Sequence, residues 1–138
     1  MKKYLIALFA LALIPLTGCA AKKGNIMDGD DMVRKFVYTQ ITQDEAKRMM
    51  QDKPDCVIVD VRRQDEYASG HIPGAICVPN ETIGDGKPEE LPDMAQVILV
   101  YCRSGNRSKQ AAQKLADMGY SNVYEFGGII DWTGDIEK

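Results

Sequence analysis

Five apolar stretches along the chain predict β-strands. Residues 56–60 and 97–101 form almost uninterrupted apolar runs, which are typical of strands covered on both faces of a parallel sheet. Residues 36–41 alternate apolar and polar side chains, and two short runs lie at residues 75–78 and 122–126. The pattern therefore predicts a sheet of several short strands.

Helix signals lie between these stretches. Thr42 and Glu45 form a capping box, which predicts a helix that begins at this point. Residues 80–93 contain few apolar side chains and read mostly as a loop, with a helical turn expected around residues 89–91. Further helices are expected at residues 65–69, 108–118 and 129–132.

Strands that alternate with helices predict an α/β domain with a central, mainly parallel sheet flanked by helices. In such sheets, ligands bind beyond the carboxyl ends of the strands. Both Asp60 and Cys102 fall at that end of a predicted strand. Cys102 therefore occupies a position where a functional site is expected.

The first residues have the features of a secretory signal. Lys2 and Lys3 precede an almost wholly apolar run at residues 4–16, which is too short for an ordinary membrane-spanning helix. The run ends in Leu-Thr-Gly-Cys, with Cys19 last, and this ending resembles the bacterial lipobox. The resemblance implies cleavage before Cys19, lipidation of its thiol and anchoring to a membrane on the outer side of the cytoplasm. The alternative is a plain secreted protein in which this cysteine is a coincidence.

These features divide the chain into three parts. Residues 1–18 are the predicted signal peptide, residues 19–33 the lipidated cysteine with a polar tether, and residues 34–138 one folded domain. The chain has 17 lysines and arginines against 20 acidic residues, a net charge of −3. Its basic residues form no extended stripe, so nucleic acid is not an expected partner.

Cys102 opens a turn between a strand and a helix. A helix N-terminus offers unpaired N–H groups and partial positive charge, which lower the pKa of a thiol and attract anions. First turns usually carry acidic residues, but here the turn has Arg103, Arg107 and Lys109. Gly105 allows backbone N–H groups to turn inward. We therefore expect a reactive thiolate in a positive pocket rather than a buried structural cysteine.

Several sequence segments occur together in an order that resembles the rhodanese superfamily, specifically its single-domain sulfurtransferases. The resemblance extends from about Val37 to Trp132. The segments that carry it are Asp60-Val61-Arg62, Glu66-Tyr67, Gly70-His71-Ile72-Pro73-Gly74-Ala75, Cys102-Arg103-Ser104-Gly105-Asn106-Arg107-Ser108, and Gly127-Gly128 with Trp132. It implies a three-layer α/β domain with a catalytic cysteine at the base of a cradle of backbone amides.

The implied reaction is sulfur transfer. Cys102 would take the outer sulfur of thiosulfate or a similar anionic donor as a persulfide, and cyanide or a thiol would then remove it. No metal or organic cofactor is implied. Backbone amides and two guanidinium groups would bind the donor anion, so the expected substrate-binding residues are Arg103, Ser104, Gly105, Asn106, Arg107 and Ser108.

The sequence leaves two other functions open. Phosphatases of the same fold have five residues between the cysteine and the closing arginine, whereas four separate Cys102 from Arg107. The shorter loop favours a sulfur atom over a phosphate group. A persulfide carrier or anion-binding module that serves a partner protein is also compatible with a reactive Cys102.

The remaining prominent residues are expected to be structural. Cys56 and Cys77 lie in apolar strand patterns and are expected to be small buried side chains, although a disulfide stays open. His71 is not needed as a general base beside a thiol of low pKa. Asp60 and Arg62 are expected to make structural polar contacts at the rim of the site, and Trp132 is expected in the core.

Overall fold

The computed structural model describes residues 36–138; the predicted signal peptide, Cys19 and the tether lie outside this range. Five strands form one sheet in the order β1-β5-β4-β2-β3, and every pairing of neighbouring strands is parallel. This confirms the predicted α/β architecture. The strands are β1 (Thr39–Gln40), β2 (Val57–Asp60), β3 (Ile76–Cys77), β4 (Ile98–Cys102) and β5 (Val123–Gly128).

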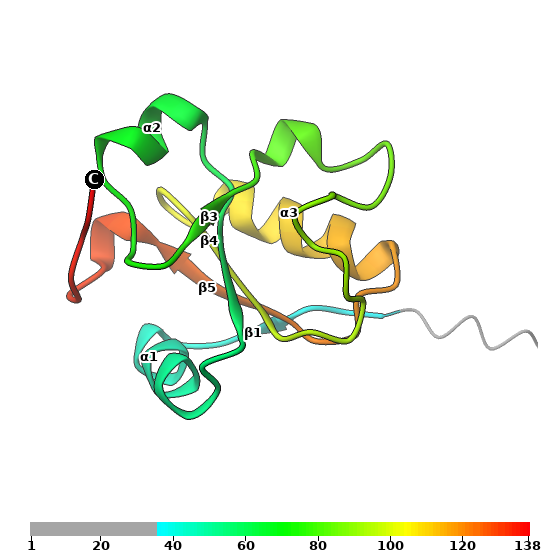
Figure 1. The fold of residues 1–138 in the computed structure, drawn as a ribbon, viewed down its shortest axis with the longest axis horizontal. Helices are drawn as coiled ribbons and strands as arrows, with labels where there is room; N and C mark the ends of the chain where they lie inside the picture. Colours follow the sequence, from blue (N-terminus) through cyan, green and yellow to red (C-terminus); the bar gives the residue numbers. More distant parts are fainter. Residues whose placement is uncertain (1–35) are drawn as a thin grey trace, which may run out of the picture. The chain divides into compact units, whose positions relative to one another are not determined.

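Helices cover both faces of the sheet, with α1 and α3 on opposite sides (Figure 1). Parallel strands need crossover connections, and the helices supply most of them. No helix within residues 36–138 is both long enough and apolar enough to cross a membrane. The helices are α1 (Gln43–Asp52), α2 (Gln64–Ser69) and α3 (Asn106–Asp117), with short 3₁₀ helices η1 (Asn80–Thr82) and η2 (Ile129–Asp131).

The start of α1 follows from its sequence. The Thr42 hydroxyl accepts a hydrogen bond from the Glu45 backbone N–H at 3.2 Å, and the Glu45 carboxylate accepts one from the Thr42 N–H at 2.7 Å. This capping box confirms the predicted helix start. Ala46 is fully buried against the sheet, so the cap also fixes which side of α1 faces the core.

Two expected elements are shorter or absent. The predicted strand at residues 36–41 contains only two strand residues, because β1 is an edge strand whose one neighbour, β5, begins at Val123. The helical turn expected around residues 89–91 is present only as a single hydrogen-bonded turn at Glu89 and Glu90, and the helical residues of this loop are those of η1. The Pro88 carbonyl accepts a hydrogen bond from the Leu91 N–H, which closes a single turn there without extending it.

Two boundaries near the predicted site also differ. The helix begins at Asn106, two residues earlier than expected, because Gly105 adopts a left-handed φ of 101° and turns the chain directly into α3. Gly127 and Gly128 end β5 rather than forming a separate turn, and η2 follows at once.

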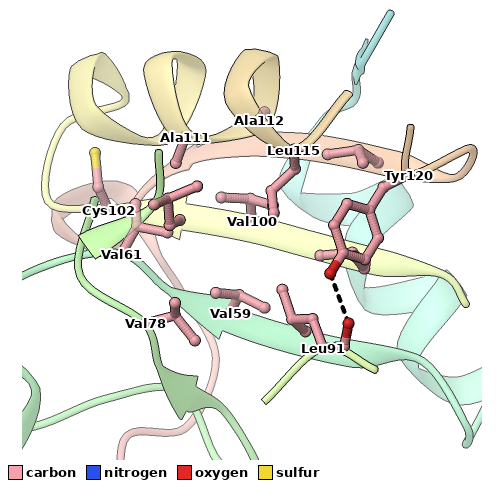
Figure 2. Packing of buried hydrophobic residues seen from close by; sticks show 13 residues of the cluster. Val59, Val61, Val78, Leu91, Val100, Cys102, Ala111, Ala112, Leu115 and Tyr120 are labelled. Carbon is pink, nitrogen blue, oxygen red and sulfur yellow. Dashed lines mark hydrogen bonds between the residues drawn. The ribbon is translucent and has the colours of Figure 1, made fainter. Parts of the chain in front are cut away.

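The core has two halves, one on each face of the sheet. Strand β4 is fully buried, and its side chains alternate: Ile98, Val100 and Cys102 face α3, whereas Leu99 and Tyr101 face the other side. Figure 2 shows the α3 side, where hydrophobic side chains from the sheet and helix pack together and Cys102 lies at one end of the cluster. There the Tyr120 hydroxyl donates a hydrogen bond to the Leu91 carbonyl at 2.6 Å, which satisfies a buried polar group.

Candidate active site

Cys102 is the last residue of β4 and is almost fully buried, with 1% of its surface exposed. The register between β4 and β5 shifts just before it, so that Cys102 pairs with Gly128. Its sulfur lies at the start of α3, and the Gly105 backbone N–H donates a hydrogen bond to Sγ at 3.0 Å. The strand and the helix thus place the sulfur among backbone N–H groups.

The surroundings of the sulfur have opposing effects on its pKa. Burial raises the pKa of the Cys102 thiol, but hydrogen bonds from the Ser108 hydroxyl and from the backbone N–H groups of Ser108, Gly105 and Ser104 outweigh burial and lower it. The direction agrees with the sequence prediction. The groups that lower the pKa are hydrogen-bond donors, whereas the prediction also included the positive charge of nearby arginines.

Arg107 is engaged by a carboxylate that sequence reasoning missed. Its two terminal nitrogens donate to the two oxygens of Glu66, on α2, at 2.6 and 2.9 Å. Hydrogen bonding from Arg107 lowers the pKa of Glu66 to about 2, although partial burial opposes this. The first turn of α3 contains no acidic residue, as the sequence shows, but α2 brings a carboxylate to it from 41 positions away.

The other predicted donor-binding residues occupy different environments. Gly105 and Ser108 are buried, whereas Arg103, Ser104 and Asn106 are exposed. The Arg103 backbone carbonyl accepts a hydrogen bond from the Ile130 N–H at 3.2 Å, which ties the loop to η2. The predicted residues therefore surround Cys102 as one loop, with some groups inside the fold and others open to solvent.

Glycine is required where the loop packs against β5. A side chain at Gly128 would overlap with the backbone of Arg103 and Ser104, so the two segments approach as closely as backbones can. Gln43, the first residue of α1, donates to the Gly128 carbonyl at 2.9 Å. The Gly127-Gly128 pair, part of the sequence resemblance, thus allows the end of β5 to pack directly against the backbone of the loop.

Glu125 is a second residue of the site that sequence reasoning did not identify. It lies in β5 with only 2% of its surface exposed. Its Oε1 accepts hydrogen bonds from the Ser108 hydroxyl at 2.6 Å and from the Gly127 N–H at 2.8 Å, and its Oε2 accepts one from the Gln40 side chain at 3.1 Å. The signal in the sequence was a charged residue inside an otherwise apolar strand pattern.

Asp60 and Arg62 form a buried ion pair with N–O distances of 2.7 to 3.0 Å. Tyr101 donates to Asp60 at 2.8 Å, and Arg62 also donates to the Gly70 carbonyl at 2.7 Å. Asp60 is 0% and Arg62 5% exposed, so the predicted structural role holds, but the expected position at the rim is wrong. This buried, hydrogen-bonded pair is a structural element at the carboxyl end of β2.

His71 and Trp132 also have structural contacts. The His71 ring stacks on Tyr67 at 3.8 Å between ring centroids and forms a hydrogen bond to the Tyr67 carbonyl at 3.0 Å. Trp132 was expected in the core, but it is only half-buried and packs on Phe126 at the edge of the buried cluster. Neither residue contacts Cys102 through any of these interactions.

Cys56 and Cys77 are free thiols, which answers the question left open by the sequence. Cys77 pairs with Asp60 on the neighbouring strand β2, and Cys56, just before β2, precedes Asp60 by four residues. Four residues of strand span about 13 Å, whereas a disulfide needs Cα atoms within about 7 Å. Burial is the main reason why the pKa of each thiol is raised. Both residues are half-buried.

A pocket of about 350 Å³ lies beside the loop, and Cys102 is not among the residues that line it. The loop contributes Ser104 and Gly105 to its wall, and β5 contributes Glu125. Within residues 36–138, no group of three or more His, Cys, Asp and Glu side chains is arranged to hold a metal ion.

Comparison with known proteins identifies the family. The Rhodanese-like domain model matches residues 42–135, and the chain belongs to this family. Thiosulfate sulfurtransferase PspE of Escherichia coli is 36% identical over 73 residues, which cover 53% of this chain and 70% of PspE. A solved structure from Staphylococcus saprophyticus has a TM-score of 0.62 at 33% identity, covering 72% of this chain and 99% of that one.

Other relatives are much longer proteins. A tRNA uridine(34) hydroxylase of Photorhabdus laumondii is 36% identical over 98 residues, which cover 64% of this chain and 27% of the hydroxylase. The chain thus spans about a quarter of the length of such relatives. The family includes sulfurtransferases and proteins named for another reaction, so family membership alone does not decide the substrates.

Proposed function

We propose that this protein is a sulfurtransferase in which Cys102 carries sulfur as a persulfide from thiosulfate or a similar donor to cyanide or a thiol. The observation that supports this most directly is the buried sulfur with a lowered pKa, held by the N–H groups of its own loop. A thiolate is the nucleophile that sulfur transfer requires. The similarity to PspE, named as a thiosulfate sulfurtransferase, agrees with this choice.

The first step is attack by the Cys102 thiolate on the outer sulfur of thiosulfate. A new S–S bond forms, the S–S bond of thiosulfate breaks, and sulfite leaves with the bonding electron pair. The N–H groups of the loop would stabilise the charge on the terminal sulfur of the persulfide, as oxyanion-hole donors do. Arg103 and Arg107 would hold the sulfonate end of the donor, and Arg107 would then exchange part of its contact with Glu66 for the donor anion.

The second step removes the outer sulfur. Cyanide attacks the terminal sulfur, thiocyanate leaves, and Cys102 returns as the thiolate. If a thiol is the acceptor, its thiolate attacks instead, and the product is a persulfide of that thiol. No electrons are supplied from outside in either case, since the sulfane sulfur only changes its partner.

Intact-mass analysis tests the first step. Full-length protein treated with thiosulfate should gain the mass of one sulfur atom, and Cys102→Ala should gain none. Cys77→Ala is the matched control, because it removes a thiol from the end of another strand and should leave the gain intact. Failure of the wild type to gain sulfur from thiosulfate and other sulfane donors would refute the proposal.

Turnover separates this function from its rivals. A transferase forms thiocyanate over many cycles with thiosulfate and cyanide, whereas a persulfide carrier is loaded once and then waits for its partner. Aryl phosphate hydrolysis that disappears in Cys102→Ser would favour a phosphatase instead. The loop has four residues between Cys102 and Arg107, which supports sulfur as the transferred group.

We further propose that the protein is a lipoprotein anchored through Cys19 to a membrane, with its folded domain outside the cytoplasm. The lipobox-like ending of the N-terminal apolar run supports this location. Replacement of Cys19 by alanine should move the protein from the membrane fraction to the soluble fraction of the cell envelope. Retention in the membrane fraction after this change would contradict lipid anchoring at Cys19.

A further inference from the structure

The proposed reaction gives Arg107 a donor anion to bind, but it gives no role to the carboxylate that already engages this residue. Both terminal nitrogens of Arg107 donate to Glu66, at 2.6 and 2.9 Å. The other two cations of the segment, Arg103 and Lys109, form no ion pair with any residue in the range 36–138. Within that range, the charge of Arg107 is therefore the one in this segment that the fold compensates.

Glu66 is also held by the backbone of its own helix. Its Oε2 accepts a hydrogen bond from the Arg63 N–H at 3.1 Å, at the start of α2. The side chains of Arg107 and Glu66 are 26% and 18% exposed, so water screens their charges only in part. The contact is thus a fixed feature of the site rather than a passing contact between two solvated side chains.

A donor anion that binds Arg107 must share it with Glu66. The carboxylate stays ionised at neutral pH, because hydrogen bonding from Arg107 holds the pKa of Glu66 at about 2. Repulsion between this carboxylate and the donor grows with the charge of the donor. Thiosulfate is a dianion, whereas the persulfide of a thiol and a thiosulfonate are monoanions. Glu66 therefore opposes the binding of thiosulfate more strongly than the binding of these other sulfane donors.

We propose that Glu66 is a specificity-determining residue of the donor site, which compensates the charge of Arg107 and shifts the preference of the site from dianionic toward monoanionic sulfane donors. This inference rests on the proposed function, in which Arg107 binds the donor and Cys102 takes its outer sulfur. It adds the class of donor that this site favours, as defined by charge.

The test compares two donors that differ by one charge. Methanethiosulfonate has a methyl group in place of one sulfonate oxygen of thiosulfate and has the same outer sulfur. With either donor, the Cys102 thiolate takes the outer sulfur, the S–S bond of the donor breaks, and sulfite or methanesulfinate leaves with the bonding electron pair. Quenched single-turnover loading of the full-length protein, followed by intact mass with Cys102→Ala as the blank, gives the half-saturating concentration and limiting rate for each donor.

Glu66→Gln should raise the loading efficiency for thiosulfate relative to methanethiosulfonate by about fivefold. Most of this gain should come from a lower half-saturating concentration of thiosulfate. The same thiolate attacks both donors, so a change in its nucleophilicity cancels in the ratio. Glutamine retains an oxygen that can accept the hydrogen bond from the Arg63 N–H, so the start of α2 is preserved.

Asp65→Asn is the matched control. Asp65 is the neighbouring carboxylate on α2, but it is exposed and pairs with Arg63 at 3.0 Å rather than with Arg107. This variant should leave the ratio between the two donors unchanged. Glu66→Asp retains the charge and should stay within about twofold of the wild-type ratio. An aspartate variant that raises the ratio as much as glutamine would show that hydrogen-bond geometry, not charge, selects the donor, and would overturn the proposal.

Glu66→Ala removes the charge without placing an amide N–H opposite Arg107, and it serves as the test if the glutamine variant does not fold. A charge-removing variant that changes loading from both donors equally would show a structural role for Glu66 and overturn the proposal. An unchanged ratio with unchanged rates would overturn it as well. If the wild type takes sulfur from neither donor, the proposed function fails instead, so the two failures remain distinguishable.

Discussion

Two cysteines end parallel strands of the same sheet, yet the fold treats their thiols in opposite ways. Cys77 ends β3 and Cys102 ends β4. Burial, the main cause, raises the pKa of the Cys77 thiol, and the nearby Asp60 carboxylate raises it further. Cys102 is more deeply buried, but its pKa is lowered. Burial and position on a strand end therefore do not decide the reactivity of a thiol in this sheet.

The difference lies in the chain segment that comes after each strand. After Cys102 the chain turns into α3 within three residues, so unpaired N–H groups of the turn and first helical residues point at the sulfur. After Cys77 the chain continues through Val78 and Pro79, and the Cys77 sulfur contacts the Arg62 carbonyl at 3.7 Å. One sulfur meets donors and the other meets an acceptor, and only donors stabilise a thiolate.

The largest expected effect comes from moving the loop away from the sulfur. Gly128→Ala places a methyl group where the backbone of Arg103 and Ser104 lies, and neither backbone segment can move without loosening the loop. We expect Cys102 to lose its lowered pKa, sulfur uptake to fall by more than about a hundredfold, and stability to fall by roughly 1–3 kcal/mol. Intact mass and chemical denaturation measure these effects.

Gly84→Ala is the matched control for this change. Gly84 has no positive φ and nothing within 4 Å of the position of an added Cβ atom. It should leave both sulfur uptake and the free energy of unfolding unchanged. If Gly128→Ala also leaves Cys102 as reactive as before, the close approach of the loop to β5 is not what distinguishes Cys102 from Cys77.

Competitive alkylation at pH 7 compares the two thiols directly. Cys77 is more exposed than Cys102, so accessibility alone predicts that Cys77 reacts faster. The pKa directions predict the reverse, with Cys102 ahead by more than about tenfold, since each pKa unit changes the thiolate fraction about tenfold below the pKa. Peptide mapping after limited reaction gives the ratio, and faster labelling of Cys77 would contradict the assignment of thiolate character to Cys102.

Ser108→Ala should raise the pKa of the Cys102 thiol part of the way toward that of Cys77. The hydroxyl is the first of the groups that lower the pKa of Cys102, but three backbone N–H groups remain. We therefore expect the midpoint of the pH dependence of Cys102 alkylation by iodoacetamide to rise by about one pH unit. Ser108→Thr retains the hydroxyl and should restore the midpoint. A threonine variant that behaves like the alanine variant would show that packing, rather than the hydroxyl, accounts for the change.

The sheet and most helices were predictable because they depend on local signals. The uninterrupted run at residues 97–101 became the central strand, and the capping box at Thr42 marked the start of α1. At residues 89–91 the chain forms only a single hydrogen-bonded turn. The Leu91 carbonyl accepts a hydrogen bond from the distant Tyr120, a contact that a local pattern does not reveal.

Within the site, the sequence revealed the groups that are close in the chain and missed those that are distant. The loop from Cys102 to Ser108 supplies its own N–H groups, so its effect on the thiol follows from its order of residues. Glu66 and Glu125 reach the loop from α2 and β5. An account based on the loop alone therefore overstated the positive charge of the pocket, since both carboxylates come from elsewhere in the fold.

The smallest predicted effect concerns the negative charge that Glu66 brings to Arg107. If hydrogen bonds rather than guanidinium charge set the difference between Cys102 and Cys77, then Glu66→Gln should barely move the alkylation midpoint of Cys102. Its effect should appear in acid stability instead. Arg107 lowers the pKa of Glu66 from 4.5 to about 2, so this contact stabilises the fold above about pH 4.5 and is lost as the pH falls through about 2.

We expect the wild type to exceed Glu66→Gln in free energy of unfolding by about 1 kcal/mol near neutral pH, a modest value because solvent screens a partly exposed pair. Denaturant unfolding at several pH values between 2 and 7 should show this difference shrinking below pH 4.5. A constant difference would mean that the glutamine disturbs packing rather than charge. A shift of the Cys102 alkylation midpoint by a full pH unit would give a different result. It would mean that the charge of Arg107, freed from Glu66, is a main determinant of the pKa of Cys102, the property that separates this thiol from Cys77.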